Sequence, residues 1–187
     1  MCGIIGINSN KEVTSTILNS LRKLEYRGYD SAGIATLNSG YIQEVKCEGR
    51  VDNLEKNIIK NKLLGNLGIG HVRWATHGIP STLNAHPHSS DNVSVVHNGI
   101  IENSTLLKKF LVKKGHRFKS QTDTEVIVHL ITEYLKKNNL IDTLTTVLKK
   151  LHGSFALGII FKDEPDLIVG ARRGSPLAVG YGPGENY

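Results

Sequence analysis

Apolar residues recur along the chain with two different spacings, and each spacing predicts one kind of element. Val13, Ile17, Leu21 and Leu24 lie three or four positions apart, so we expect an amphipathic helix over residues 11–25. The same spacing predicts helices at residues 52–62, 105–114, 123–137 and 141–151. Short apolar runs predict strands at residues 3–7, 32–37, 41–47, 67–71, 93–97, 154–161, 166–171 and 177–181. This order of elements is typical of an α+β fold with helices packed against antiparallel sheets.

Turn and cap residues mark several boundaries between these elements. Residues 38–40 (Asn-Ser-Gly) predict a hairpin between two of the strands. Asn103 or Ser104 stands where it can cap the helix that follows, and Gly115 stands where it can close it. The stretch 77–92 is polar and rich in Gly, Pro and His, and a loop of that length in a compact domain is usually functional.

Length, composition and charge favour one ordinary globular domain. The chain has 187 residues, 39% of them hydrophobic, and one domain has about 150. The net charge is +6, but the lysines lie singly or in pairs on helix-like stretches, which indicates solvated helix faces. We therefore expect no nucleic-acid partner. No run reaches the roughly 18 apolar residues of a membrane span, and the N-terminus lacks a signal-peptide pattern. We expect a cytoplasmic protein without membrane contact.

Cys2 follows Met1 directly, and this position gives it a chemical interpretation. Removal of Met1 would leave a thiol and a free α-amine on one residue. An α-amine has an ordinary pKa of about 7.7–8.0, so it can act as a base near neutral pH. One residue would then supply both nucleophile and base, the arrangement of N-terminal nucleophiles. On position alone, a small buried hydrophobe that opens a strand is the favoured interpretation, and we interpret Cys47 in that structural way.

Residues 70–80 bring an arginine, the only tryptophan of the chain, a hydroxyl and an imidazole into one short segment. The planar guanidinium of Arg73 suits a carboxylate ligand. The alternative is a structural ion pair between Arg73 and an internal Asp or Glu. For Arg73 taken alone, the structural alternative is favoured.

Two further segments also have a chemical and a structural interpretation. Asn98 and Gly99 place a side-chain amide beside a backbone N–H, and two donors aimed at one oxygen form an oxyanion hole. The same dipeptide is a common turn. Thr122 or Asp123 stands where it can cap the helix at 123–137, although an Asp there can instead bind an ammonium group. Taken singly, the turn and the cap are favoured.

Five histidines are dense enough in the middle of the chain to suggest a metal site: His71, His77, His86, His88 and His97. None stands at helical i, i+4 spacing beside a Glu, and no cysteine pair accompanies them. We therefore expect no metal ion and no cofactor.

Together, these segments resemble one known family, in order and over the whole chain. The family comprises the glutaminase domains of glucosamine-6-phosphate synthases, which are class II glutamine amidotransferase domains of the N-terminal nucleophile hydrolase superfamily. The matching segments are CGIIG (2–6), LEYRGYDSAG (24–33), GHVRWATHG (70–78), NAHPH (84–88), HNGIIEN (97–103), TDTEV (122–126) and RRGSPL (172–177).

The resemblance implies a fold and a chemistry. The fold would be a four-layer αββα sandwich of two antiparallel sheets between helices. Cys2 would attack the side-chain amide of L-glutamine, form a glutamyl thioester and release ammonia, with its own α-amine moving the proton. The Asn98 side chain and the Gly99 N–H would hold the oxyanion, and one such donor is worth about 3–4 kcal/mol.

The resemblance also implies how the substrate is held. Arg73 would bind the α-carboxylate of glutamine, and Asp123 would bind its α-ammonium. The other positions carried over are Thr76 and His77 in the wall of the site, Trp74 in a mobile covering loop, and Arg27 and Gly28 beside the nucleophile.

The resemblance covers one domain of a larger enzyme. Residues 1–187 would form the glutaminase domain, truncated within its closing strands, and the two sugar-isomerase domains that use the ammonia on fructose 6-phosphate would be absent. The full-length enzyme is expected to be a dimer. If Met1 is retained, Cys2 lacks its base and the chain is inactive. A different N-terminal nucleophile amide hydrolase and a catalytically silent glutamine-binding fragment remain as alternatives.

Overall fold

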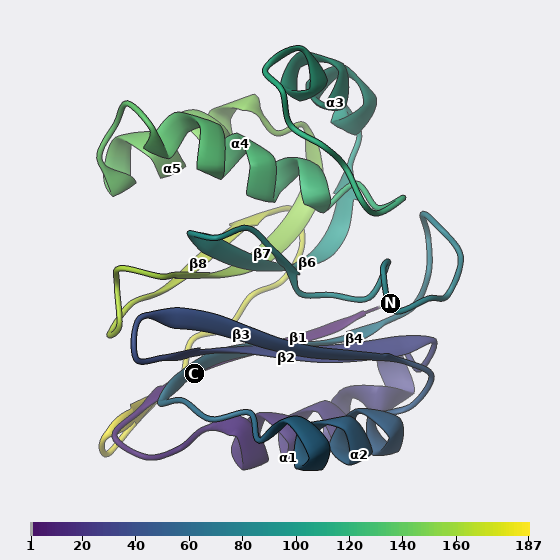
Figure 1. Ribbon diagram of the computed structural model, residues 1–187, viewed down its shortest axis with the longest axis vertical. Coiled ribbons are helices and arrows are strands. Elements are labelled where there is room, and N and C mark those ends of the chain that lie inside the picture. The colour runs from purple at the N-terminus through teal and green to yellow at the C-terminus, as the bar shows by residue number, and fades with distance from the viewer. Residues whose placement is uncertain (1) are drawn as a thin grey trace.

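The computed structural model describes residues 2–187, so the expectation about Met1 lies outside the described residues. The described chain forms four layers, with two sheets face to face and helices on the outer face of each sheet (Figure 1). This arrangement confirms the predicted α+β sandwich.

The first sheet has six strands in the order β3-β2-β4-β1-β10-β9, and every neighbouring pair is antiparallel. Two helices cover its outer face, and a short 3-10 turn, η1, follows the first of them. The elements of this half are β1 (Gly3–Ser9), α1 (Thr14–Leu24), η1 (Glu25–Arg27), β2 (Ser31–Asn38), β3 (Tyr41–Glu48), α2 (Val51–Asn61), β4 (Leu67–Arg73), β9 (Tyr181–Gly182) and β10 (Glu185–Asn186).

The second sheet has four antiparallel strands in the order β5-β6-β7-β8, and α4 and α5 lie across its outer face. The elements of this half are β5 (His88–Ser89), β6 (Val93–Ile101), α3 (Ser104–Lys113), α4 (Glu125–Leu135), α5 (Leu140–Lys150), β7 (Gly153–Phe161) and β8 (Ile168–Arg173).

Three apolar clusters hold these layers together, one for each pair of neighbouring layers. One cluster lies between the first sheet and its helices, and it buries Ile17 and Leu21 of α1 as the helical spacing predicts. A second, larger cluster lies between the second sheet and its helices. The third joins the two sheets and includes Ile69 of β4 and Val96 of β6. Burial of apolar surface on both faces of each sheet therefore fixes the sandwich.

Three sequence predictions need correction at element boundaries. β6 continues past its predicted end at residue 97 to Ile101, because Asn98–Ile101 pair with Gly153–Ala156 of β7. α4 begins at Glu125 rather than 123. Residues 177–180 of the predicted strand 177–181 are not in a strand. The short β9–β10 hairpin reaches only the end of β1, at Asn8 and Ser9, so the predicted strand lacks a partner along most of its length.

The predicted turn and helix end are confirmed, whereas the predicted cap is not. Ser39 and Gly40 both have positive φ in the hairpin between β2 and β3. Gly115 has φ +92 and ends α3. Asn103 stands at the N-cap of α3 without capping it, because its side chain bridges Lys150 O and His152 N.

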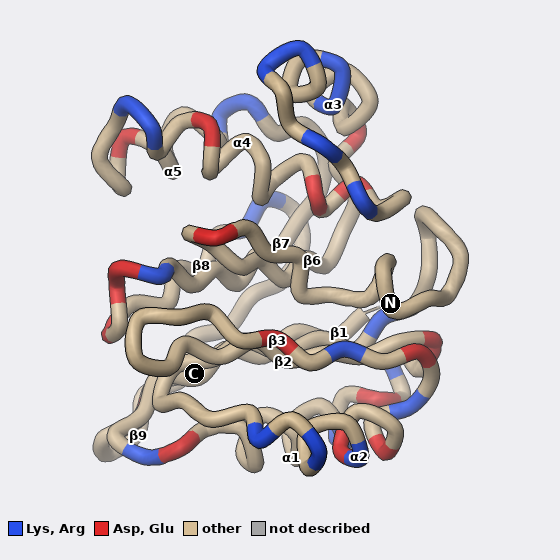
Figure 2. Tube along the Cα trace, in the orientation of Figure 1, with Lys and Arg blue, Asp and Glu red and all other residues tan. Residues whose placement is uncertain are grey.

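Lysine and arginine are spread over both helical layers (Figure 2). Within the described part of the chain, no helix is long and apolar enough to cross a membrane.

Candidate functional site

Cys2 lies at the start of β1. The end of β4, the neighbouring strand in the first sheet, lies beside it. Its thiol donates to Trp74 O at 3.5 Å, and Trp74 N–H donates to Sγ at 3.2 Å. Burial raises the pKa of the Cys2 thiol, and the contact with the Trp74 backbone lowers it by less. At neutral pH the thiol is therefore protonated and needs a base before it can attack.

The backbone carbonyl of Cys2 is held from two sides. Arg27 Nε donates to it at 3.0 Å from η1, and Asn98 Nδ2 donates to it at 3.1 Å from β6. A primary amide carries two N–H donors, so this bond leaves Asn98 one further N–H. Since β1 and β6 belong to different sheets, Asn98 also fixes the nucleophile relative to the second sheet.

Gly28 and Gly99 stand where a side chain would collide with backbone. A Cβ at Gly28 would lie 2.5 Å from the Arg73 carbonyl carbon, so glycine lets the turn after η1 approach the end of β4. Gly99 has φ +130, and a Cβ there would lie 2.1 Å from Ser154 O. The Asn98-Gly99 pair is thus part of a strand in unusual backbone geometry, and the turn interpretation is wrong.

Arg73 is 3% exposed at the end of β4. Its Nη2 donates to the carbonyls of His77 and Gly78, and its Nη1 donates to Ile79 O at 3.3 Å. Its Nη1 also lies 3.7 Å from Asp30 Oδ1. The guanidinium therefore organises the loop after β4. Its contact with Asp30 is the internal ion pair that the structural alternative for Arg73 predicts, and its five N–H groups exceed the three hydrogen bonds.

Asp123 is buried just before α4, and it does not act as the cap of that helix. Its Oδ2 accepts from Ile101 N at 2.7 Å, and its Oδ1 lies 4.0 Å from His97 Nδ1. The N-cap position belongs to Thr124, which makes no side-chain capping bond. The predicted Thr122 or Asp123 cap is therefore wrong.

The whole segment before α4 is fixed side chain by side chain. Glu125 accepts from the Lys119 and Ser120 N–H groups at 2.8 and 2.7 Å. Thr122 Oγ1 is hydrogen-bonded to His88 Nε2 at 2.9 Å. Thr124 Oγ1 is hydrogen-bonded to the imidazoles of His86 and His97. These bonds hold Asp123 in place without a regular helix.

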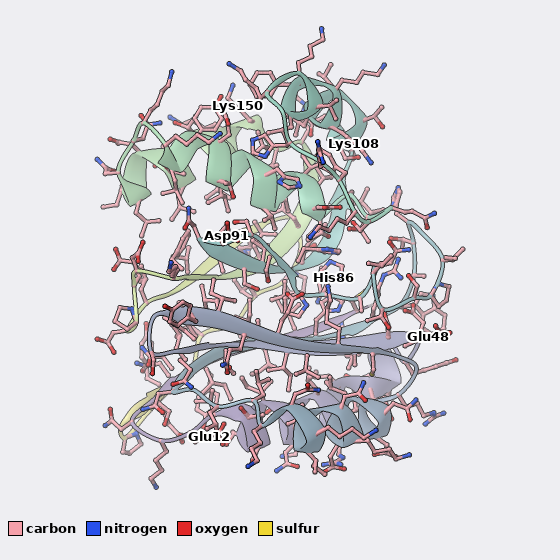
Figure 3. All side chains as sticks on the ribbon, in the orientation of Figure 1. Glu12, Glu48, His86, Asp91, Lys108 and Lys150 are labelled. Carbon is pink, nitrogen blue, oxygen red and sulfur yellow. The ribbon has the colours of Figure 1, made fainter. Side chains whose placement is uncertain are left out.

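Four histidines form a buried group between the sheets. Thr124 Oγ1 lies 2.7 Å from His86 Nε2 and 2.9 Å from His97 Nδ1, and His71 Nε2 donates to His97 O at 3.0 Å. His71 and His86 stack with ring centroids 4.2 Å apart, and His86 lies in the layer between the sheets (Figure 3). The fourth member is His88, whose ring is edge-on to His86.

Burial lowers the pKa of each of these four imidazoles. The pKa falls to about 3 for His71 and His88, to about 4 for His97, and well below its ordinary value for His86. All four are therefore neutral at pH 7. Among residues 2–187, no group of three or more His, Cys, Asp or Glu side chains is arranged to hold a metal ion.

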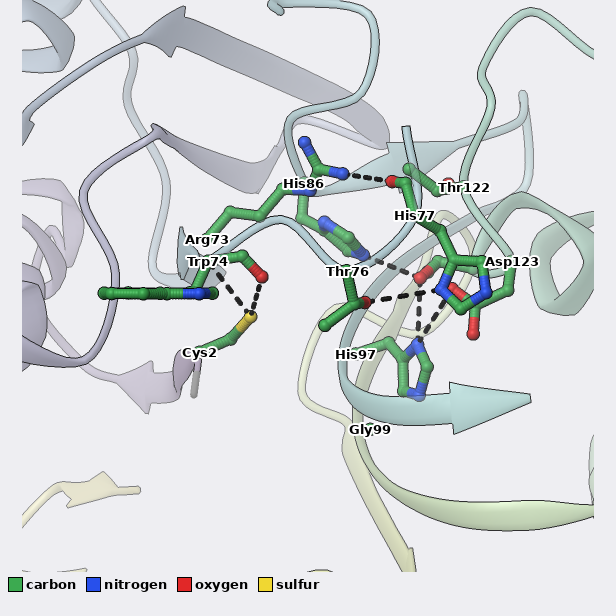
Figure 4. Close-up of a pocket in the computed structure, with 11 residues that line it drawn as sticks. Cys2, Arg73, Trp74, Thr76, His77, His86, His97, Gly99, Thr122 and Asp123 are labelled. Carbon is green, nitrogen blue, oxygen red and sulfur yellow. Dashed lines mark hydrogen bonds and ion pairs between the residues drawn. The ribbon is translucent and has the colours of Figure 1, made fainter. Parts of the chain in front are cut away.

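Seven of the ten predicted site residues converge on one small cavity of about 20 Å³ (Figure 4). Its lining contains a thiol, a buried cation and a buried anion. The predicted residues that line it are Cys2, Arg73, Trp74, Thr76, His77, Gly99 and Asp123, and four further residues join them: His86, His97, Thr122 and Thr124.

Three predicted residues lie beside this cavity instead of lining it. Arg27 and Asn98 reach Cys2 through its carbonyl, and Gly28 packs on the Arg73 backbone. Trp74 is 48% exposed, and its indole is edge-on to Tyr29 at 5.6 Å.

Sequence reasoning missed the residues that support the site. Asp30 accepts from Ala75 N and holds the chain after Arg73. The sequence indicates only a metal-ligand interpretation for His86 and His97, and it indicates no role for Thr124. Their signal was present as buried polar types within the motifs NAHPH and TDTEV, but only tertiary contacts show that they bond to one another.

Comparison with known proteins gives one consistent result. Residues 71–186, more than half of the chain, match the family of glutamine amidotransferase domains. The chain is 54% identical to the glutamine–fructose-6-phosphate aminotransferase (isomerizing) of Clostridium acetobutylicum and 52% identical to that of Zymomonas mobilis. Each alignment covers all of this chain but 31% of the relative, so the chain spans about a third of their length.

Solved structures agree with this result. The chain matches the glutamine phosphoribosylpyrophosphate amidotransferase of Bacillus subtilis with a TM-score of 0.86 and 28% identity, over all of this chain and 41% of that one. A glutamine aminotransferase class-II domain protein from Silicibacter pomeroyi shares the fold at a TM-score of 0.60 and 15% identity, over 94% of this chain and 78% of that one.

Proposed function

Because the chain belongs to the family of glutamine amidotransferase domains, we propose that its cavity hydrolyses the side-chain amide of L-glutamine with Cys2 as the nucleophile. One observation carries the proposal. The Cys2 thiol, the Arg73 cation and the Asp123 anion line the same cavity. A free α-amino acid offers an anion and a cation at one end, and the glutamine side chain offers an amide for the thiol at the other.

The reaction divides into two halves. In the first, Sγ attacks the amide carbon, the tetrahedral intermediate collapses to a glutamyl thioester, and the amide nitrogen leaves as ammonia with the thiol proton. In the second, water adds to the thioester and releases glutamate and the Cys2 thiol. The thiol needs a base, because its raised pKa keeps it protonated at neutral pH. That base is the α-amine that Cys2 carries once Met1 is removed.

The negative oxygen of the intermediate needs two donors. Gly99 lines the cavity, and Asn98 Nδ2 lies 3.1 Å from Cys2 O. We assign the Gly99 N–H and the second N–H of Asn98 as the two donors. Loss of one such donor is expected to cost about 3–4 kcal/mol of transition-state stabilisation. Thr76, His77 and Trp74 also line the cavity, and we assign the first two to the wall around the amino-acid end and Trp74 to the cover of the opening.

We infer the destination of the ammonia from the names of the relatives. Their full-length enzymes are named for amino transfer to fructose 6-phosphate, and this chain aligns with about a third of them. We therefore propose that a sugar-phosphate synthase domain receives the ammonia and that the complete enzyme is a dimer. A cytoplasmic location remains a prediction from the sequence.

The test compares two cysteine variants of the chain from which Met1 has been removed, as verified by intact mass. Wild type should release glutamate and ammonia from glutamine and gain the mass of an electrophilic glutamine analogue. Cys2→Ala should lose both properties. Cys47→Ala is the matched control, because Cys47 is buried in β3 and burial raises its pKa to about 11.

Absence of glutamine hydrolysis by the folded, Met-free wild type would exclude the proposed reaction. Hydrolysis that survives Cys2→Ala would exclude the thioester route. An active chain that prefers other amides to glutamine would favour a different N-terminal nucleophile hydrolase.

A further inference from the structure

Asn84 connects two segments of the chain that are far apart in sequence. It is 2% exposed, in the loop before β5. Its Nδ2 donates to Ile79 O at 2.9 Å and to Gln121 Oε1 at 3.0 Å. Its Oδ1 accepts from Gln121 N at 2.8 Å. One planar amide thus donates to a carbonyl of its own loop and both donates to and accepts from Gln121.

Each of these segments carries one charged wall of the cavity. Ile79 O is shared between Asn84 Nδ2 and Arg73 Nη1, so Asn84 acts on the loop that the guanidinium also holds. Gln121 stands two positions before Asp123, and Ile79 N also donates to Gln121 Oε1 at 3.3 Å. We call the side chains of Asn84 and Gln121, with the Ile79 backbone, the Asn84 bridge.

We propose that Asn84 is a positioning residue that sets the separation between Arg73 and Asp123 and so selects substrates that carry both an α-carboxylate and an α-ammonium group. The inference rests on the proposed function. Two charged groups bind one amino acid tightly only when their spacing matches the ligand, and a mutation that removes such binding raises KM while kcat is unchanged.

The chemistry of the bridge requires an amide at position 84. A carboxylate would lose both N–H donors to Ile79 O and Gln121 Oε1, and an alanine would lose all three bonds. The Gln121 side chain is less critical, because its backbone N–H remains bonded to Asn84 Oδ1 when Oε1 is removed.

The experiment measures two ligands that differ by one group. L-glutamate is the expected product, and glutarate is the same molecule without the α-ammonium. Calorimetric binding of both ligands is combined with the KM and kcat for glutamine, in Met-free wild type, Asn84→Ala and Gln121→Leu. Asn139→Ala is the matched control, because it removes two side-chain hydrogen bonds at the N-cap of α5.

Asn84→Ala should raise KM for glutamine at least about 10-fold, because a charged contact worth about 1.5–3 kcal/mol is weakened, with kcat changed by less than about 3-fold. It should weaken glutamate binding far more than glutarate binding. Gln121→Leu should shift both quantities in the same direction by less, and Asn139→Ala should shift neither. The rate of Cys2 alkylation by iodoacetamide should stay at the wild-type value.

Equal loss of glutamate and glutarate binding in Asn84→Ala, or an unchanged KM, would overturn the inference. If Asn84→Ala does not fold, Gln121→Leu decides the question by the same criterion. A wild type that binds glutamate in preference to glutarate but does not hydrolyse glutamine would contradict the proposed function alone, and the binding ratio would still test Asn84.

Discussion

At the scale of single residues, backbone geometry restricts the site as strongly as chemistry does. Gly99 combines a positive φ with a Cβ position only 2.1 Å from Ser154 O. Gly115 has φ +92, and nothing lies within 4 Å of the position its Cβ would take. An alanine at Gly115 would therefore pay only for its positive φ, whereas an alanine at Gly99 would also collide with Ser154 O.

Gly99→Ala should destabilise the protein by clearly more than Gly115→Ala and should abolish glutamine hydrolysis. A non-glycine residue at positive φ costs about 1–2 kcal/mol, and Gly99→Ala adds the displacement of β7. Urea denaturation and kcat of both variants check this. Equal destabilisation, or an active Gly99→Ala, would show that β6 relaxes locally and that the Gly99 N–H need not be held in place.

At the scale of elements, a contact between the end of β6 and the residues before α4 holds Asp123, the anionic residue of the cavity. Asp123 Oδ2 accepts from the N–H of Ile101, the last residue of β6. This bond gives the carboxylate a structural task in addition to its proposed contact with the substrate ammonium. Its charge and its hydrogen bond can be separated, because an asparagine side-chain oxygen also accepts from Ile101 N.

Asp123→Asn should therefore keep the melting temperature within about 2 °C of wild type and raise KM for glutamine at least about 10-fold. A charged hydrogen bond is worth about 1.5–3 kcal/mol, and the substrate ammonium would lose one. Asp123→Ala should raise KM and also lower the melting temperature, since it leaves Ile101 N buried and unbonded. An unchanged KM in Asp123→Asn would remove Asp123 from the proposed ammonium site.

At the scale of the whole molecule, the histidine group joins the two sheets. His71 belongs to β4 of the first sheet and His97 to β6 of the second, and His86 lies between them. An unfolded histidine has a pKa of about 6.5, whereas burial lowers the pKa to about 3 for His71 and about 4 for His97. The unfolded chain therefore binds more protons than the folded chain between these values.

Stability should be highest above about pH 6.5 and should fall as the pH decreases toward about 4. Each neutral buried histidine contributes about 1.4 kcal/mol of loss per pH unit below 6.5. Urea midpoints at pH 7.5 and 5.5 measure the slope. His88→Gln should reduce it by about one histidine's share, whereas His152→Gln, at an exposed position, should not. An equal change of stability with pH in wild type and both variants would contradict a buried, neutral His88.

Much of the fold could be predicted from the sequence, because helical and strand periodicity are local properties. The buried positions of α1 followed from their spacing, and the hairpin after β2 followed from Ser39 and Gly40. The end of β6 and the start of α4 could not be predicted. Pairing with β7 extends β6, and hydrogen bonds to Asp123 and Glu125 fix the residues where α4 begins.

The sequence by itself determined the family, the order of the elements and the chemical types at the site, because motifs and periodicity are written in adjacent residues. Only the tertiary structure decided which side chains meet. Asn98 reaches Cys2 across 96 positions, and Asn84 reaches Gln121 across 37. Such contacts depend on how two sheets pack and register, and no local pattern specifies that packing.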